Sequence, residues 1–293
     1  MKKTLLIKIL LGLWEFTKTI LLPAAIFFAG LFFADIIRKK EKRESQEELK
    51  KYFYTIADLE CKLTKDQVIE YDKCAERIKL YETINVTVRP IIGLPIDAYN
   101  AINKKDLFFA YSVNQYRNLP YDFSNIITHF ESINNAHLEI TSSDNKFVKT
   151  VTPLIIEFNT HNINFRNILL ELFNNFDMEQ KTFENDKFLV DLGIIWGPFR
   201  DKEIQDNDFN INVVYNELVL KLLDFTSKTK DPRKNQLVEL LMPWNNCCEQ
   251  LIVQYDTYYT FLINRSATLE KASTQIMSSL LFLNNPPSFD MRF

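Results

Sequence analysis

The chain has 293 residues, of which 46% are hydrophobic, and its formal net charge is −3. This length is sufficient for one large hydrophobic core or two modest ones. Basic residues concentrate in the first 43 positions and the remainder is acidic, which argues against nucleic acid as a partner because affinity for phosphates comes mainly from Lys and Arg.

Residues 1–18 predict an amphipathic helix. One polar stripe at helical spacing comprises Thr4, Lys8, Gly12, Glu15 and Thr19, and apolar residues occupy the other positions. The segment either lies in a membrane interface or continues directly into the next segment, with Trp14 as an interfacial anchor.

Residues 19–37 form an apolar stretch in which Asp35 is the one charged residue. At about 1.5 Å of rise per residue, a helix of this length nearly matches a hydrocarbon core of about 30 Å. A cleaved signal peptide is the alternative, but a lead of 18 residues precedes the stretch and no small-residue cleavage site follows it. We therefore predict a single-pass transmembrane helix that is retained.

A cluster of cations follows this stretch at Arg38, Lys39, Lys40, Lys42 and Arg43. Anionic lipid head groups would meet these cations, and the positive-inside bias favours a cytosolic domain. The four cysteines show no secreted disulfide framework. We expect a bacterial inner (cell) membrane protein with its soluble domain in the cytosol.

Two pairs of small residues lie four positions apart in the same stretch, Ala25 with Ala29 and Gly30 with Ala34. Such pairs let spanning helices approach closely, although small residues are common in these helices anyway. They raise self-association, and a pore built from oligomerised N-terminal helices, as alternatives.

Residues 38–84 are interpreted as a basic flank and helical stalk. The apolar residues with helical spacing are Leu49, Phe53, Ile56, Leu59 and Leu63. Thr64–Gln67 matches a capping box and predicts the start of a second helix, which runs to Ile84. Residues 85–95 contain two prolines and a glycine and are interpreted as a linker or a short strand.

Residues 85–293 predict a bundle of long helices, so the expected fold class is mainly α, a transmembrane helix followed by a long-helix bundle domain. The first stripe comprises Phe123, Ile126, Phe130, Ile133, His137 and Ile140. Thr152 and Pro153 predict a helix start, followed by a seam of Ile155, Phe158, Asn162, Phe165, Leu169, Leu172 and Phe176. A last seam comprises Trp244, Cys248, Leu251, Tyr255, Tyr258, Leu262, Arg265, Leu269, Ala272 and Ile276. Shorter helices are expected around Val214–Phe225 and after Asp231 and Pro232.

The stretch Asp206–Glu217 places acidic and amide residues at the ligand positions of an EF-hand-like calcium loop. Ile211 stands where such a loop requires glycine, and a β-branched residue at positive φ is strained. The alternative is that Asp208 or Asn210 caps the following helix, and we predict no metal site.

The remaining polar candidates predict structural roles. His129, His137 and His161 lack metal-ligand spacing, and His137 on an apolar stripe is expected to be a hydrogen-bonded core residue. Asn162 interrupts an apolar seam, so it either fixes the register of an oligomer or forms a hydrogen bond within a monomeric core.

No catalytic, cofactor-binding or metal-binding motif is found, and with five glycines the chain lacks the glycine-rich loops that hold phosphates. We therefore predict no cofactor, no small-molecule substrate and no enzymatic activity. The expected function is that of a membrane-anchored scaffold, sensor or membrane-acting effector that binds the lipid bilayer and a protein partner or itself. The alternative is an enzyme whose active site follows no motif.

Overall fold

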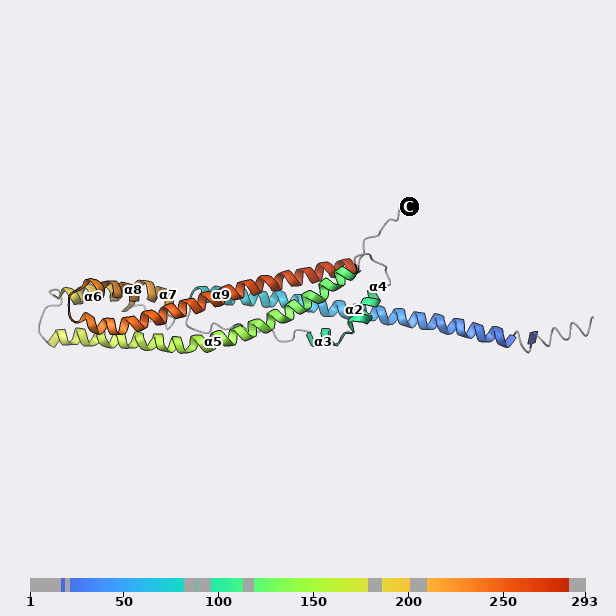
Figure 1. Ribbon diagram of the computed structural model, residues 1–293, viewed down its shortest axis with the longest axis horizontal. Coiled ribbons are helices and arrows are strands. Elements are labelled where there is room, and N and C mark those ends of the chain that lie inside the picture. Colours follow the sequence, from blue (N-terminus) through green and yellow to red (C-terminus); the bar gives the residue numbers. More distant parts are fainter. Residues whose placement is uncertain are drawn as a thin grey trace, which may run out of the picture. The chain divides into compact units, whose positions relative to one another are not determined.

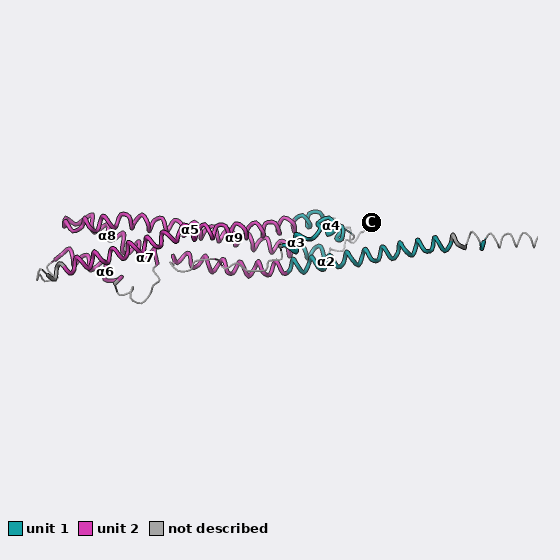
Figure 2. The backbone as a smooth tube through the Cα atoms, turned by 90° about the horizontal axis from the view of Figure 1, so that it is seen from below, with its two compact units in different colours: residues 1–58, 95–124, 280–293 teal, residues 59–94, 125–279 magenta. Residues whose placement is uncertain are grey.

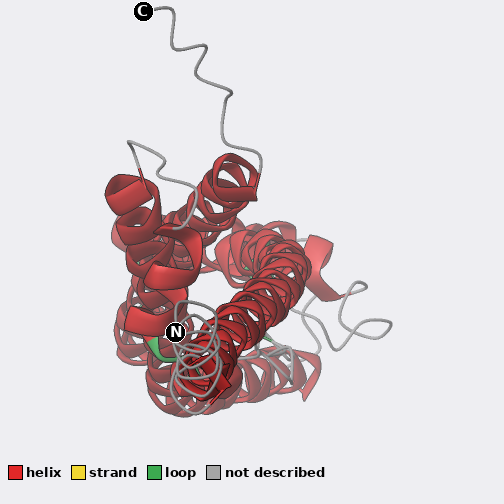
Figure 3. Cartoon of the chain, turned by 90° about the vertical axis from the view of Figure 1, so that its right-hand side faces the viewer, coloured by secondary structure: helices red, strands yellow, loops and turns green. Residues whose placement is uncertain are grey.

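The computed structural model describes residues 17–18, 22–81, 88, 96–112, 119–178, 186–200 and 210–284. Nearly all of these residues are helical, and none of them belongs to a β-strand, as Figure 3 shows. The prediction of a mainly α protein is confirmed.

Three long helices dominate the described part of the chain (Figure 1). They are α2 (Leu22–Lys79), α5 (Leu119–Met178) and α9 (Lys234–Asn284). The shorter elements are α3 (Ile96–Ala101), α4 (Lys104–Ser112), α6 (Lys187–Arg200), α7 (Ile211–Val214), the π-helical turn η3 (Tyr215–Val219) and α8 (Leu220–Lys228). The helix predicted around Val214–Phe225 is confirmed as α7, η3 and α8 in succession.

The chain divides into two compact units (Figure 2). Unit 1 comprises Met1–Asp58, Pro95–Ser124 and Leu280–Phe293, and unit 2 comprises Leu59–Leu94 and Asn125–Ser279. In unit 1, Phe53 of α2 is fully buried, and its ring centroid lies 6.5 Å from those of Tyr99 and Tyr111. The ammonium of Lys50 lies 5.6 Å from the centroid of the Tyr111 ring, so an aromatic cluster holds α3 and α4 against α2.

In unit 2, the second part of α2 packs with α5 and α9. The thiol of Cys61 on α2 donates to the carbonyl of Ser273, and the hydroxyl of Ser266 donates to Asp72, so α9 runs antiparallel to α2. The α5 and α9 helices are also antiparallel, and the stacked rings of Phe147 and Tyr258 lie 4.3 Å apart between them. A helical bundle is predicted for residues 85–293, and the observed bundle also includes α2 from Leu59 onward, within the segment interpreted as a helical stalk.

Most members of the two predicted seams are buried, whereas Ile155 and Arg265 are half-buried and the side chain of Phe176 lies outside the described part of the chain. On α5 the buried members are Phe158, Asn162, Phe165, Leu169 and Leu172. On α9 they are Trp244, Cys248, Leu251, Tyr255, Tyr258, Leu262, Leu269, Ala272 and Ile276. The aromatic rings interlock across the seam, with the centroid of Trp244 6.0 Å from that of Phe158 and 5.6 Å from that of Phe165.

The capping box predicted at Thr64–Gln67 is wrong, because α2 continues through it as one helix. The stripe expected through Leu59 is also displaced, since Leu59 is exposed while Glu60, Thr64 and Gln67 are buried. Apolar residues that precede and follow this stretch in the same helical phase keep this face of α2 in the core, so tertiary packing overrides the local capping signal.

The helix start predicted at Thr152 and Pro153 is likewise wrong, because Pro153 lies inside α5. Thr152 and Pro153 are exposed, whereas Val151 and Phe158 are buried. Proline has no N–H to donate to the carbonyl of Lys149. Because Lys149 is exposed, water can reach this carbonyl while the buried face of α5 stays in phase, which lowers the cost of an internal proline. Pro243 is internal to α9 in the same way, so the helix expected after Pro232 and the last seam belong to one helix.

The predicted transmembrane helix over residues 19–37 is not supported. Within the described residues, no helix is both long enough and apolar enough to cross a bilayer. The described part of α2 begins at Leu22 and reaches Asp35, Arg38 and Lys39 before an apolar stretch of sufficient length has accumulated. Residues 19–21 and the predicted amphipathic helix up to residue 16 lie outside the described residues.

Candidate functional site

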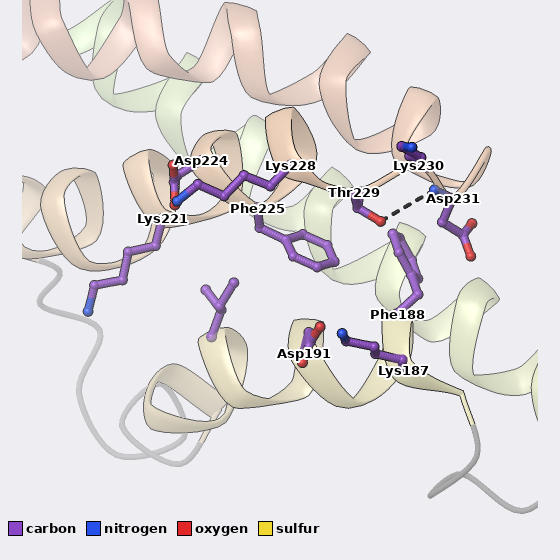
Figure 4. Close-up of a pocket in the computed structure, with 11 residues that line it drawn as sticks. Lys187, Phe188, Asp191, Lys221, Asp224, Phe225, Lys228, Thr229, Lys230 and Asp231 are labelled. Atoms are coloured by element: carbon purple, nitrogen blue, oxygen red, sulfur yellow. Dashed lines mark hydrogen bonds and ion pairs between the residues drawn. The ribbon is translucent and has the colours of Figure 1, made fainter.

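A hollow of about 690 Å³ opens between α6 and α8 in unit 2 (Figure 4). Apolar and charged side chains both line it. Phe188 of α6 and Phe225 of α8 direct their rings into the space between the helices, with centroids 5.3 Å apart. Ile195 lines the same hollow about two turns further along α6.

A second hollow of about 280 Å³ continues along α6. It shares Ile195 and Lys221 with the first and is lined by Ile194, Ile195, Pro198, Phe199, Val213, Glu217 and Lys221. The two hollows therefore form one elongated depression along α6, with α8 and then α7 and η3 opposite. We refer to the residues lining both hollows as the α6 groove.

Charged side chains surround the apolar floor. Those lining the first hollow are Lys187, Lys221, Lys228, Lys230, Asp191, Asp224 and Asp231. Asp224 accepts a hydrogen bond from Lys228 at 2.6 Å, and Glu217 forms an ion pair with Lys221. Both pairs join residues four positions apart on one helical surface.

An arginine holds the start of α6 next to the start of α9. The guanidinium of Arg233 donates to both carboxylate oxygens of Asp186 at 2.8 and 2.9 Å and to both of Asp231 at 2.9 and 2.7 Å. It also lies 4.5 Å from the centroid of the Phe188 ring. Bidentate pairs of this kind fix orientation as well as adding energy, so this cluster positions one wall of the α6 groove.

The electrostatics of this cluster favour its charged form. Hydrogen bonds from Arg233 lower the pKa of Asp186 and of Asp231. The same bonds raise the pKa of Arg233 above its ordinary value. Asp186 also accepts from the backbone N–H of Leu189 at 3.2 Å, which caps the first turn of α6.

The calcium-loop interpretation of Asp206–Glu217 receives no support from its described part. Ile211 begins α7 rather than forming a sharp turn, and the Asn210 side chain accepts from the backbone N–H of Val213 at 3.0 Å. The alternative, a capping role for Asn210, is confirmed. Glu217 pairs with Lys221, and Asp206 and Asp208 lie outside the described residues.

The three histidines lie in different environments. His137 is buried and hydrogen-bonded to Tyr71, which confirms that it is a core residue. His161 lies 3.5 Å from Glu157 of its own helix. His129 has a pKa lowered by burial and by the charge of Lys271. Within the part of the chain that the structure describes, no group of His, Cys, Asp and Glu residues could hold a metal ion.

The four cysteines, Cys61, Cys74, Cys247 and Cys248, are buried free thiols. Burial raises the pKa of Cys74 to about 11 and that of Cys247 to about 12. Thiols with such values carry little thiolate at neutral pH and react slowly. They are packing residues.

A second feature of the described chain is the exposed apolar start of α2. Its large apolar residues are Ile26, Phe27, Phe28, Leu31, Phe32, Phe33, Ile36 and Ile37, with exposed fractions from 44% to 67%. They occupy every side of the helix, and Asp35 pairs with Lys39 at 2.6 Å where the basic cluster begins. We refer to residues 26–37 as the apolar arm.

The apolar arm is recognisable in the amino-acid sequence, whereas α6 and its groove are not predicted from it. Gly193, Gly197 and Pro198 interrupt the segment and argue against a helix. The Asp186 cap before an apolar run was a signal that could have revealed it.

Comparison with known protein families, characterised proteins and solved structures gives no match for this chain.

Proposed function

We propose that this protein attaches to a membrane through the apolar arm and that its helical body acts by binding other proteins. The observation that carries the proposal is the exposure of eight large apolar side chains on the arm. Exposed apolar patches of this extent mark surfaces that a membrane or another protein covers.

A lipid bilayer fits the apolar arm better than a protein interface does. Its apolar residues surround the helix rather than forming one stripe, whereas an interface with another helix requires only one apolar face. The cations from Arg38 to Arg43 follow directly, and anionic head groups would attract them by about 1 kcal/mol each near the surface. The proposed location is the bacterial inner membrane, with the body on the cytosolic side by the charge rule.

Protein binding by the body is supported by the α6 groove. Its floor of Phe188, Phe225 and Ile195 lies inside a charged rim, and interface hot spots combine an apolar centre with a polar surround. Burial raises the pKa of the Cys74, Cys247 and Cys248 thiols. These thiols and the paired carboxylates of Asp224 and Asp231 give no specific reason to favour an enzyme.

The test is vesicle flotation of the full chain. We expect the wild type to float with vesicles of phosphatidylcholine and phosphatidylglycerol. A Phe28→Asp, Phe32→Asp variant should lose at least about tenfold in partitioning, because burying each Phe contributes about 1.5–3 kcal/mol. Leu138→Asp with Ile156→Asp is the matched control, since both residues are exposed on α5; it should float like the wild type.

Flotation of the arm variant at the wild-type level would contradict membrane attachment. Protein binding is measured separately by photo-crosslinking in cells from positions on the body, with the products identified by mass spectrometry. If no position on the body yields a protein adduct, the binding function is wrong. Protection of the body from protease in intact spheroplasts is the expected result for the cytosolic side.

A further inference from the structure

We propose that the α6 groove docks a short segment of a partner protein that presents apolar side chains together with carboxylates. This inference rests on the proposed protein-binding function and specifies the surface and the chemistry of the partner. Shape, apolar character and hydrogen-bonding capacity each support it.

The shape of the groove suits a peptide segment. The α6 helix has 14 residues, so it is roughly 21 Å long at standard helical rise. Its hollows of about 690 and 280 Å³ follow one another along this helix and share Ile195 and Lys221. An elongated depression of this length accommodates about four turns of a helix, the geometry of helix-in-groove recognition.

The floor supplies apolar anchoring sites along the whole length. Phe188 and Phe225 face one another in the first hollow (Figure 4). In the second, Ile194 is 69% exposed and Val213 is 41% exposed, so both have apolar surface that a partner would remove from water. Aliphatic or aromatic side chains of the partner fit these positions.

The charged rim favours a partner that carries carboxylates, because Asp224 and Asp231 of the rim are already paired within the chain whereas two of its lysines are not. Asp224 accepts from Lys228, and Asp231 accepts from Arg233. In contrast, Lys187 and Lys230 form no hydrogen bond or ion pair with any described residue. Free ammonium donors at one end of the groove fit carboxylates of a partner.

Asp191 also lines the first hollow but is not one of the paired carboxylates described above. It lies one turn from Lys187 on α6, and the two side chains are on the same side of the helix in Figure 4. At this separation Asp191 partly offsets one of the two lysines. Lys230, on the far side of the hollow, keeps its full attraction for an anion.

The test measures binding of three fluorescein-labelled helical peptides of about 12 residues to the full chain in detergent, by fluorescence anisotropy. The peptides share Leu and Phe at positions i, i+4 and i+7. At their variable positions, the first peptide carries Glu, the second Gln and the third Lys. We expect the Glu peptide to bind at least about tenfold more tightly than the Lys peptide, with the difference falling at high salt.

Variants locate the binding. Lys187→Glu and Lys230→Glu should each weaken binding of the Glu peptide about fivefold. Ile195→Asp, which places a charge on the floor, should weaken all three peptides at least about tenfold. The matched control is Lys146→Glu with Lys149→Glu, since both lysines are exposed on α5; it should bind like the wild type. Thermal melts verify that each variant is folded.

Equal binding of the three peptides, wild-type binding by Ile195→Asp, or no binding by any peptide would overturn the inference. Sedimentation of the chain alone provides another decisive result: self-association abolished by Ile195→Asp assigns the groove to a second copy of the chain and also overturns it. None of these results changes vesicle flotation or crosslinks from other positions on the body, so the proposed function is judged separately.

Discussion

The hydroxyl of Tyr71 on α2 lies 3.1 Å from Nδ1 of His137 on α5, and both side chains are buried. The pair is a polar connection inside an otherwise apolar interface. Burial lowers the pKa of His137 to about 4, so the imidazole is neutral at physiological pH. Nε2 of the same ring is buried without a hydrogen-bond partner in the described structure.

His137 should make the fold sensitive to acid. Its pKa is depressed in the folded state, so the unfolded chain binds more protons between about pH 6.5 and 4. Its contribution to stability is therefore complete above about pH 6.5 and is lost as the pH falls through that window, by at most about 3 kcal/mol. Urea unfolding of the wild type and of Tyr71→Phe, His137→Phe between pH 4 and 7 measures this.

The double variant is preferred because it removes both polar partners at once. His137→Phe alone would leave the Tyr71 hydroxyl buried and unpaired, which costs about 1–3 kcal/mol at every pH. The acid-dependent loss should disappear in the double variant. If the double variant loses stability in acid as steeply as the wild type, His137 is not the responsible group.

Glu60 should produce the opposite dependence on pH. Its side chain is 1% exposed, and neither carboxylate oxygen has a hydrogen-bond partner in the described structure. Burial raises its pKa to about 7. Since the folded state then holds the proton more tightly, the stability falls as the pH rises from about 4.5 to 7, by at most about 3 kcal/mol.

The Glu60→Gln variant tests this assignment by urea unfolding. It should be more stable than the wild type at pH 8, because the amide carries no charge into the core. Between pH 4.5 and 6.5 the contributions of Glu60 and His137 oppose one another. The Gln variant should therefore gain stability as the pH rises through this window, and a stability that still declines toward pH 7 would rule Glu60 out.

These residues also show why the sequence predicted some helices better than others. On α9 every position of the seam except Arg265 carries an apolar or aromatic residue, so local spacing is sufficient to identify the buried face. On α2 the buried face includes Glu60, Thr64 and Gln67 while Leu59 is exposed. Its phase is determined by contacts with α5 and α9, which are distant in sequence and leave no local signal.

The α6 groove could not be predicted for a similar reason. Its floor combines residues of α6 with Phe225 of α8, and the intervening sequence does not indicate that these helices meet. The apolar arm, in contrast, is recognisable from composition alone. The membrane span predicted over residues 19–37 is not supported within the described residues, where Asp35, Arg38 and Lys39 limit the apolar part of α2.

Arg233 should stabilise unit 2 mainly by joining Asp186 to Asp231. Removing it with Arg233→Ala leaves two carboxylates without their donors, and we expect a loss of about 1–2 kcal/mol measured by urea unfolding. Arg233→Lys should recover only part of this, because an ammonium cannot bind two carboxylates in bidentate fashion. Since the pKa of both aspartates is lowered, the contribution should be lost as the pH falls below about 4. Equal stability of the Lys variant and the wild type would show that charge alone is sufficient.

The neighbouring residues Leu169 and Leu170 provide the most direct test of the α5 seam, because they differ in burial and not in type. Leu169 is 3% exposed and Leu170 is 60% exposed. Leu169→Asp places an unpaired charge in the core and should cost at least about 3 kcal/mol. Leu170→Asp, the matched control, should change stability by no more than about 0.5 kcal/mol, as exposed substitutions usually do. Thermal and urea unfolding of both variants measures the difference. A comparable loss for Leu170→Asp would mean that this face of α5 is covered in the assembled protein, and the packing derived for the single chain would then be incomplete.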